Sequence, residues 1–118
     1  MTNDSKAVED LVSAFEEACL AQDQYVFPVN ARRYNKLYSE MRAIEEELKD
    51  RNAREVLATL YNHKNAQVRL QAAGATLGLL PGPARKTLQR IIDRDEYPQA
   101  GDARGFLAAM DSGKFKPD

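Results

Sequence analysis

One stretch of this chain, residues 53–80, constrains its fold more than any other. It reads AREVLATLYNHKNAQVRLQAAGATLGLL, a short amphipathic segment followed by a polar turn and an Ala-rich segment. Asn65 suits the N-cap of the second segment, whose apolar residues surround a helix almost completely. A helix of that kind must be covered on nearly all sides. The stretch therefore predicts a helix–turn–helix unit whose second helix is central.

Two amphipathic helices are expected before this unit. Apolar residues recur at i, i+3, i+4 and i+7 in the first of them, and Asp4 or Ser5 can cap it. It should end before Phe27-Pro28, because a residue that precedes proline is pushed out of the α region. Asn30 can then cap a second helix. Residues 4–50 thus predict an N-terminal helix pair.

Two further helices are expected after the central one. Pro81-Gly82-Pro83 should stop the central helix, and Pro83 suits the first position of the next. Residues 93–101 are expected to form a loop, after which Asp102 caps a last helix that ends at Ser112-Gly113. The residues from 83 to 112 therefore predict another helix pair. No segment alternates as a strand does.

The second and third helix pairs match each other at a spacing of 35 residues without a gap. Val56-Leu57 aligns with Ile91-Ile92, and Val68-Arg69 aligns with Ala103-Arg104. The predicted fold class is therefore all-α, with six helices in three antiparallel pairs. At 118 residues the chain suits a single domain, 1–118, with a tail at 113–118 that docks through Phe115.

The segment 53–80, with a weaker echo at 83–112, resembles a HEAT-type repeat. The whole chain resembles a small bacterial family of helical domains of unknown function. The motifs that carry this second resemblance are LAQDQ, RRYNKLYSEM, NAQVRLQAA, YPQAGDA and the FKP tail. The resemblance implies a short HEAT-like α-α superhelix in which 4–50 is a diverged N-terminal pair. It implies no catalytic residue.

Charge and cysteine content exclude several classes of protein. The formal net charge of −1 argues against sequence-independent binding of nucleic acid, which needs many cations. The charge is uneven, since residues 1–29 carry −5 and residues 30–118 carry +4. Cys19 is the only cysteine, so an internal disulfide is excluded. Neither a signal peptide nor a membrane-spanning run is recognisable, and a cytoplasmic protein is expected.

No constellation of residues points to catalysis, so the chain is predicted not to be an enzyme. His63 is the only histidine and lies in a predicted turn, where it is expected to be solvated. Cys19 lies on an apolar stripe, which indicates a buried structural thiol. The run Glu45-Glu46-Glu47 is interpreted as a solvated helix face. No catalytic residue, metal site or cofactor site is expected.

Three cations at the start of the second helix are the first candidates for partner binding. Arg32, Arg33 and Lys36 stand where the helix macrodipole disfavours positive charge, and a broken local rule can mark function. The alternative is neutralisation by acids of the antiparallel first helix. Those acids are Glu16, Glu17 and Asp23.

The last loop and the repeated arginines supply the other candidates. Tyr97 and Gln99 lie in an interhelical loop, a place where scaffolds often carry function, although Tyr97 equally suits packing onto the core. The resemblance to HEAT-type repeats implies that an Arg at this place joins an internal polar ladder, so Arg69 is expected to bond an acid or a turn carbonyl. Arg104, at the equivalent position, is expected to be the more accessible group and is a candidate for partner binding.

The predicted function is a non-enzymatic protein–protein interaction module. Two alternatives stay open, an immunity-type inhibitor of a neighbouring toxin and a nucleic-acid-associated HEAT domain. The expected partner is another protein, while a membrane, a nucleic acid or a small-molecule ligand is not expected. This prediction rests on fold type and on the lack of a catalytic constellation.

Overall fold

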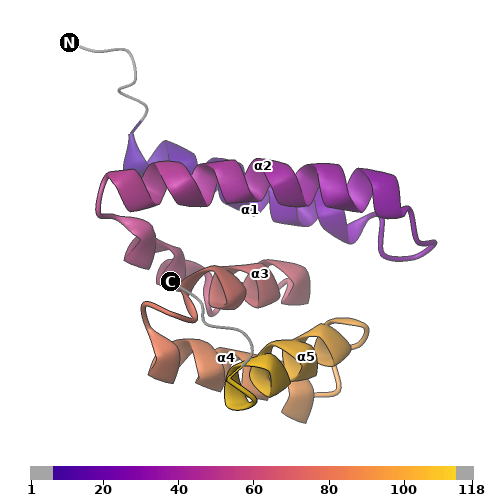
Figure 1. The fold of residues 1–118 in the computed structure, drawn as a ribbon. Coiled ribbons are helices and arrows are strands. Elements are labelled where there is room, and N and C mark those ends of the chain that lie inside the picture. Colours follow the sequence, from indigo (N-terminus) through magenta and orange to yellow (C-terminus); the bar gives the residue numbers. More distant parts are fainter. Residues whose placement is uncertain (1–6, 114–118) are drawn as a thin grey trace. The chain divides into compact units, whose positions relative to one another are not determined.

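The computed structural model describes residues 7–113. The expected caps Asp4 and Ser5, and the expected docking residue Phe115, lie outside this range. All regular elements within it are helical, so the all-α prediction is confirmed (Figure 1). They are α1 (Val8–Asp23), α2 (Ala31–Asp50), the 3-10 helix η1 (Arg54–Leu60), α3 (Ala66–Thr76), α4 (Pro81–Asp93) and α5 (Gln99–Asp111).

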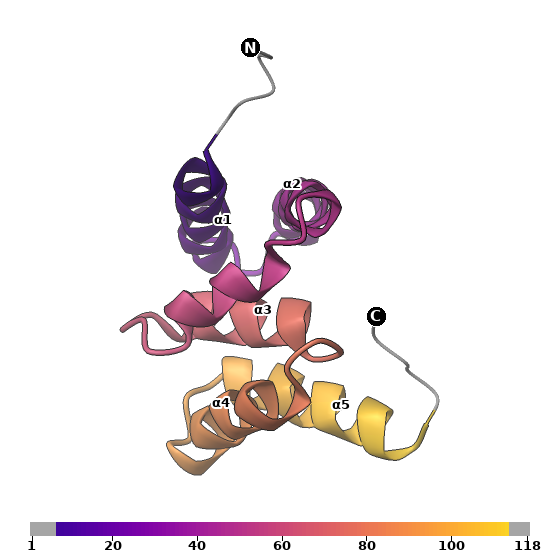
Figure 2. The ribbon, with the colours of Figure 1, turned by 90° about the vertical axis from the view of Figure 1, so that its left-hand side faces the viewer.

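The chain divides into two compact units, Met1–Val56 and Leu57–Asp118. In the first unit α1 and α2 lie side by side and run antiparallel (Figures 1 and 2). Their shared core includes Phe15 and Cys19 from α1 and Met41 and Leu48 from α2, each fully buried. The Cys19 Sγ–H donates to the Met41 Sδ at 3.3 Å, which makes the thiol part of this packing.

The second unit is built on α3, which packs against both α4 and α5 (Figure 2). Asn65 caps α3 as predicted, because its side-chain oxygen accepts hydrogen bonds from the backbone N–H groups of Gln67 and Val68 at 2.8 and 3.1 Å. Most of α3 is buried, including Val68, Leu70, Ala72 and Ala73. The prediction that this helix is central is therefore confirmed for the unit Leu57–Asp118.

Gly74 explains how closely α5 approaches α3. A Cβ atom at this position would lie 2.9 Å from Cζ of Phe106, closer than real Cβ contacts come. The glycine lowers helix propensity by about 1 kcal/mol relative to alanine, and close packing of the Phe106 ring accounts for its presence. Gly78, four residues further along the chain, lies beyond the end of α3.

The boundary between α3 and α4 differs from the prediction. α3 ends at Thr76 and α4 begins at Pro81, whereas the sequence suggested a central helix reaching residue 80 and a start at Pro83. Residues 77–79 form a turn after α3, in which the backbone N–H groups of Leu79 and Leu80 both bond the Thr76 carbonyl. Pro81 then occupies the first turn of α4, where a missing N–H costs nothing.

The predicted cap of α5 is also wrong, and the N-cap position of α1 is held by Ala7, which makes no side-chain cap hydrogen bond. α5 begins at Gln99, and Asp102 therefore lies inside its first turn instead of capping it. An acid inside the first turn is favourable because it faces the positive end of the helix macrodipole.

Candidate functional site

The connection between α1 and α2 exposes large apolar side chains in the first unit. Phe27 is 76% exposed and Val29 is 73% exposed, the highest values among the large hydrophobic residues. Arg32, Arg33 and Lys36 follow within the first two turns of α2, and all three are exposed. We name these five residues the tip surface. Sequence reasoning found its cations but missed Phe27 and Val29, because apolar residues were assigned to the core.

The cations of the tip surface stay unneutralised. Arg33 lies over the ring of Tyr25 at 5.7 Å from its centroid, a cation–π contact. Among residues 7–113, neither Arg32, Arg33 nor Lys36 forms an ion pair, so the expected neutralisation by the acids of α1 is not found. Positive charge therefore remains at the N-terminus of α2, where the macrodipole disfavours it.

Tyr97 and Arg104 form an exposed pair in the second unit. The Arg104 guanidinium lies over the Tyr97 ring at 5.6 Å, and its Nη1 donates to the Tyr97 hydroxyl. Tyr97 is exposed, so of its two predicted placements the outward one is observed. Arg104 is exposed as expected.

Gln99 is a correction to the predicted site. Its side chain is buried, and its Nε2 donates to Oε1 of Gln67 at 2.9 Å. This hydrogen bond joins the start of α5 to the start of α3. A polar residue in a loop-like sequence was mistaken for an exposed one because α5 begins earlier than predicted.

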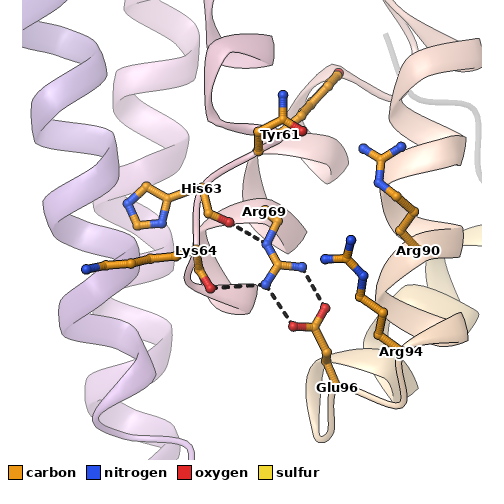
Figure 3. A pocket seen from close by; sticks show the side chains of 8 residues that line it. Tyr61, His63, Lys64, Arg69, Arg90, Arg94 and Glu96 are labelled. Atoms are coloured by element: carbon orange, nitrogen blue, oxygen red, sulfur yellow. Dashed lines mark hydrogen bonds and ion pairs between the residues drawn. The ribbon is translucent and has the colours of Figure 1, made fainter.

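Arg69 forms the polar ladder that the sequence predicted (Figure 3). Its Nε donates to the carbonyl of His63 at 2.6 Å, and its Nη2 donates to the carbonyl of Lys64 at 3.2 Å. Nη1 and Nη2 also donate to the two carboxylate oxygens of Glu96, Oε1 and Oε2, at 2.6 and 2.8 Å. This bidentate bond lowers the pKa of Glu96 and raises the pKa of Arg69. The fork therefore connects the turn before α3 to the segment before α5.

The ladder forms one wall of a pocket of about 300 Å³ (Figure 3). We name it the cationic pocket after its lining. Its lining residues are Tyr61, Asn62, His63, Lys64, Arg69, Arg90, Arg94 and Glu96. A second pocket of about 310 Å³ shares Tyr61, Asn62 and Arg90 with it, so the two are adjacent.

The buried wall of the cationic pocket is built around Tyr61. Its hydroxyl bonds that of Thr76, and burial raises the pKa of Tyr61 although this hydrogen bond opposes the rise. The Thr76 hydroxyl donates to the Ala72 carbonyl at 2.9 Å, so the proton between the two hydroxyls comes from Tyr61. This wall is structural.

The residues considered for catalysis have other roles. The His63 Nδ1 accepts a hydrogen bond from the backbone N–H of Asn65 at 3.0 Å, which places its ring within the turn. Glu45 is buried and accepts from the Arg42 Nη1 at 3.1 Å, so the interpretation of its glutamate run as wholly solvated is wrong for this residue. Burial of Cys19, with the negative charges of Glu45 and Glu16, raises the pKa of its thiol.

Clusters of metal-ligating side chains and membrane-spanning helices are both absent from residues 7–113. No group of three or more His, Cys, Asp or Glu side chains able to hold a metal ion occurs within this range. The helices described there are also too short or too polar to cross a membrane.

Comparison with known proteins places most of the chain in one family. A family model described as a domain of unknown function, DUF2019, matches residues 9–111. The crystal structure of the protein RPA1889 from Rhodopseudomonas palustris CGA009 is similar, with a TM-score of 0.91 and 38% sequence identity. The similarity covers 100% of this chain and 99% of that one. No curated protein matches.

Proposed function

Because this chain belongs to the DUF2019 family, whose function is unknown, its role has to be inferred from its own surface. We propose that it is a non-enzymatic protein-interaction module that binds its partner through the tip surface. We propose the cytoplasm as its compartment, because a chain with one thiol cannot form an internal disulfide and therefore suits a reducing environment.

The exposure of Phe27 and Val29 is the observation that carries this proposal. Burying apolar surface stabilises a complex by roughly 25 cal/mol per Å², so large apolar side chains that are exposed in the free protein contribute most when they are buried. Pro28 stands between them and restricts the backbone, which lowers the entropy lost on binding. Aromatic anchors of this kind dominate the energetics of many interfaces.

The charges around these two residues define the chemistry of the partner. Three unpaired cations lie beside the apolar pair, so the complementary surface is an apolar socket whose rim carries aspartate or glutamate. Rim charges of this kind steer association and fix its register. Arg33 can bind a carboxylate of the partner while its guanidinium stays stacked on the Tyr25 ring, and this stacking holds the guanidinium in place.

We further propose that residues 53–80 and 83–112 are diverged HEAT-like repeats. The 35-residue spacing supports this, since Val68 on α3 and Ala103 on α5 occupy equivalent positions and are both fully buried. Arg69 and Arg104 occupy the next equivalent positions with different roles, one internal and one exposed. Divergence of this kind converts a repeated structural position into a surface position.

The test begins with a photo-crosslinking amino acid in place of Phe27, in cells of the native organism, followed by mass spectrometry of the adduct. The purified partner is then titrated with the full chain and with two variants, Phe27→Ser and Arg33→Gln. We expect Phe27→Ser to weaken binding by about 2 kcal/mol or more, as loss of an interface anchor does. Raised salt should slow association.

Leu79→Ser is the matched control, because Leu79 is an exposed apolar residue of the other unit. It should leave binding unchanged. Equal losses for Phe27→Ser and Leu79→Ser, or a partner without acids around the crosslinked site, would refute the tip surface as the binding element. A partner encoded beside this gene and toxic by itself would identify the module as an inhibitor.

A further inference from the structure

The cationic pocket concentrates positive charge in a small concave volume of the second unit. Arg69, Arg90 and Arg94 contribute three cations and Glu96 contributes one carboxylate, giving a net charge of +2 with His63 counted as neutral. The whole chain carries a formal charge of −1, so this is a local excess and not a general property of the surface.

The hydrogen bonds divide these charges into a structural pair and a remainder. Arg69 and Glu96 neutralise each other through two short contacts, with the Arg69 side chain nearly buried. Arg90 and Arg94 are exposed, and neither forms a salt bridge with a residue in 7–113. Two cations therefore face the pocket without a carboxylate of their own, whereas the Lys64 side chain extends away from it (Figure 3).

The placement of the two exposed arginines is fixed by secondary structure. Arg90 lies in the last turn of α4 and Arg94 is its C-cap residue, so both extend from one helix end toward the Arg69–Glu96 pair (Figure 3). The Nη2 of Arg90 donates to the Thr87 hydroxyl at 3.4 Å, which leaves most of its donors unused. Planar guanidinium groups with unused donors match the oxygens of phosphate groups.

We infer that the cationic pocket is a binding site for a phosphate-class oxyanion, held by Arg90 and Arg94 beside the Arg69–Glu96 pair. A volume of about 300 Å³ is at the small end of ligand sites, which suits a compact anion better than a nucleotide. The adjacent pocket offers room for an organic group attached to the phosphate. This ligand class departs from the expectation, drawn from the sequence, of no small-molecule ligand.

The experiment records ¹H–¹⁵N spectra of the isotope-labelled full chain during titration with two probes, inorganic phosphate and phosphoserine. Sodium chloride holds the ionic strength constant, which removes general screening as a cause. We expect saturable shifts of the backbone amides in residues 61–64 and 90–96. Tighter binding of phosphoserine would identify an esterified phosphate as the ligand, and equal or tighter binding of inorganic phosphate would identify the free ion.

Three variants test which cations hold the anion. Arg90→Gln and Arg94→Gln should each weaken phosphate binding about tenfold or more, since each removes charge-assisted hydrogen bonds. Arg85→Gln is the matched control, because Arg85 lies on the same helix, pairs with Asp111 at 3.0 Å and does not line the pocket. It should bind phosphate as the unsubstituted chain does.

Shifts scattered over the surface cations, or no saturation with either probe, would overturn the assignment. Equal loss of affinity in the Arg85→Gln control would do the same. The shift map of the unsubstituted chain decides the question even if a variant fails to fold. The inference is independent of the tip surface, which belongs to the other unit.

Discussion

At the scale of single residues, the Arg69 fork determines how the turn before α3 is held. One guanidinium satisfies two backbone carbonyls and one carboxylate, so three acceptors depend on the same side chain. A neutral residue cannot replace it, and lysine would lose the planar, bidentate geometry.

The first prediction concerns the loss of this fork. Arg69→Ala should lower the free energy of unfolding by about 1–3 kcal/mol, because Glu96 and two carbonyls lose their donor. Urea unfolding followed by circular dichroism measures it. Arg104→Ala is the control, since that guanidinium is exposed and its hydrogen bond within residues 7–113 goes to the exposed Tyr97, and its unfolding midpoint should not move. Equal effects of the two substitutions would contradict the assigned roles.

The second prediction is a pH dependence that arises from Glu96. The hydrogen bond from Arg69, with the charges of Arg69 and Arg94, holds its pKa in the folded state below the ordinary 4.5. The stabilisation is therefore complete above the unfolded-state pKa and is lost as the pH falls through the lower folded-state value. The unfolding free energies of the unsubstituted chain and of Glu96→Gln should converge below pH 4.5.

For Arg69→Ala the difference in unfolding free energy should narrow over the same pH range but should not vanish, because the bonds of Arg69 to the His63 and Lys64 carbonyls do not depend on pH. A constant difference between the unsubstituted chain and Glu96→Gln from pH 7 to pH 3 would show that the carboxylate contributes no such linkage.

The structural role of Arg69 was predicted from the resemblance of residues 53–80 to a HEAT-type repeat, and its position four residues after the N-cap Asn65 brings its side chain back over the turn. Sequence reasoning missed the partner Glu96, 27 residues away, since no local rule relates the two. Gln99 and Glu45 were misplaced for a related reason. Burial of a polar side chain depends on what packs over it, and the helix period alone does not supply that.

At the scale of the secondary-structure element, α3 has the largest share of buried side chains in its unit. Its predicted central role followed from an apolar pattern without a polar face, which is a strong signal. Its end was harder to place. Residues 77–79 form a turn before the prolines are reached, and the apolar side chains of Leu77, Leu79 and Leu80 hide this turn in the sequence.

The third prediction tests the packing at the end of α3. Leu77 is fully buried, so Leu77→Ala should destabilise the fold by about 2–5 kcal/mol through lost contacts and a cavity. Leu79→Ala, two residues on and exposed, serves as the control and should have little effect. Thermal and urea unfolding measure both. Similar small shifts for both variants would mean that residue 77 does not belong to the core.

At the scale of the whole molecule, the charges separate between the two compact units. Met1–Val56 has eight Lys and Arg and twelve Asp and Glu, and Leu57–Asp118 has nine and six. The net charges are therefore −4 and +3, so the cationic pocket lies in the basic unit. The sequence showed this separation, but only the fold shows that the tip surface concentrates cations within the acidic unit.

The reaction rate of the lone Cys19 thiol reports how often the first unit opens. Burial keeps the pKa of this thiol above its ordinary value, and a buried thiol reacts only when its surroundings open. No second cysteine complicates the signal. The rate of reaction with a thiol reagent, divided by the rate for the unfolded chain, therefore gives the opening equilibrium of the α1–α2 pair.

The fourth prediction uses the reaction rate of this thiol. Leu48→Ala removes a fully buried side chain from the same pair and should speed the reaction by a factor that matches its loss of stability. Leu77→Ala, in the other unit, supplies the comparison. If its reaction rate stays slow while its stability falls, the chain opens one half at a time. If both variants react faster alike, the molecule opens as a whole.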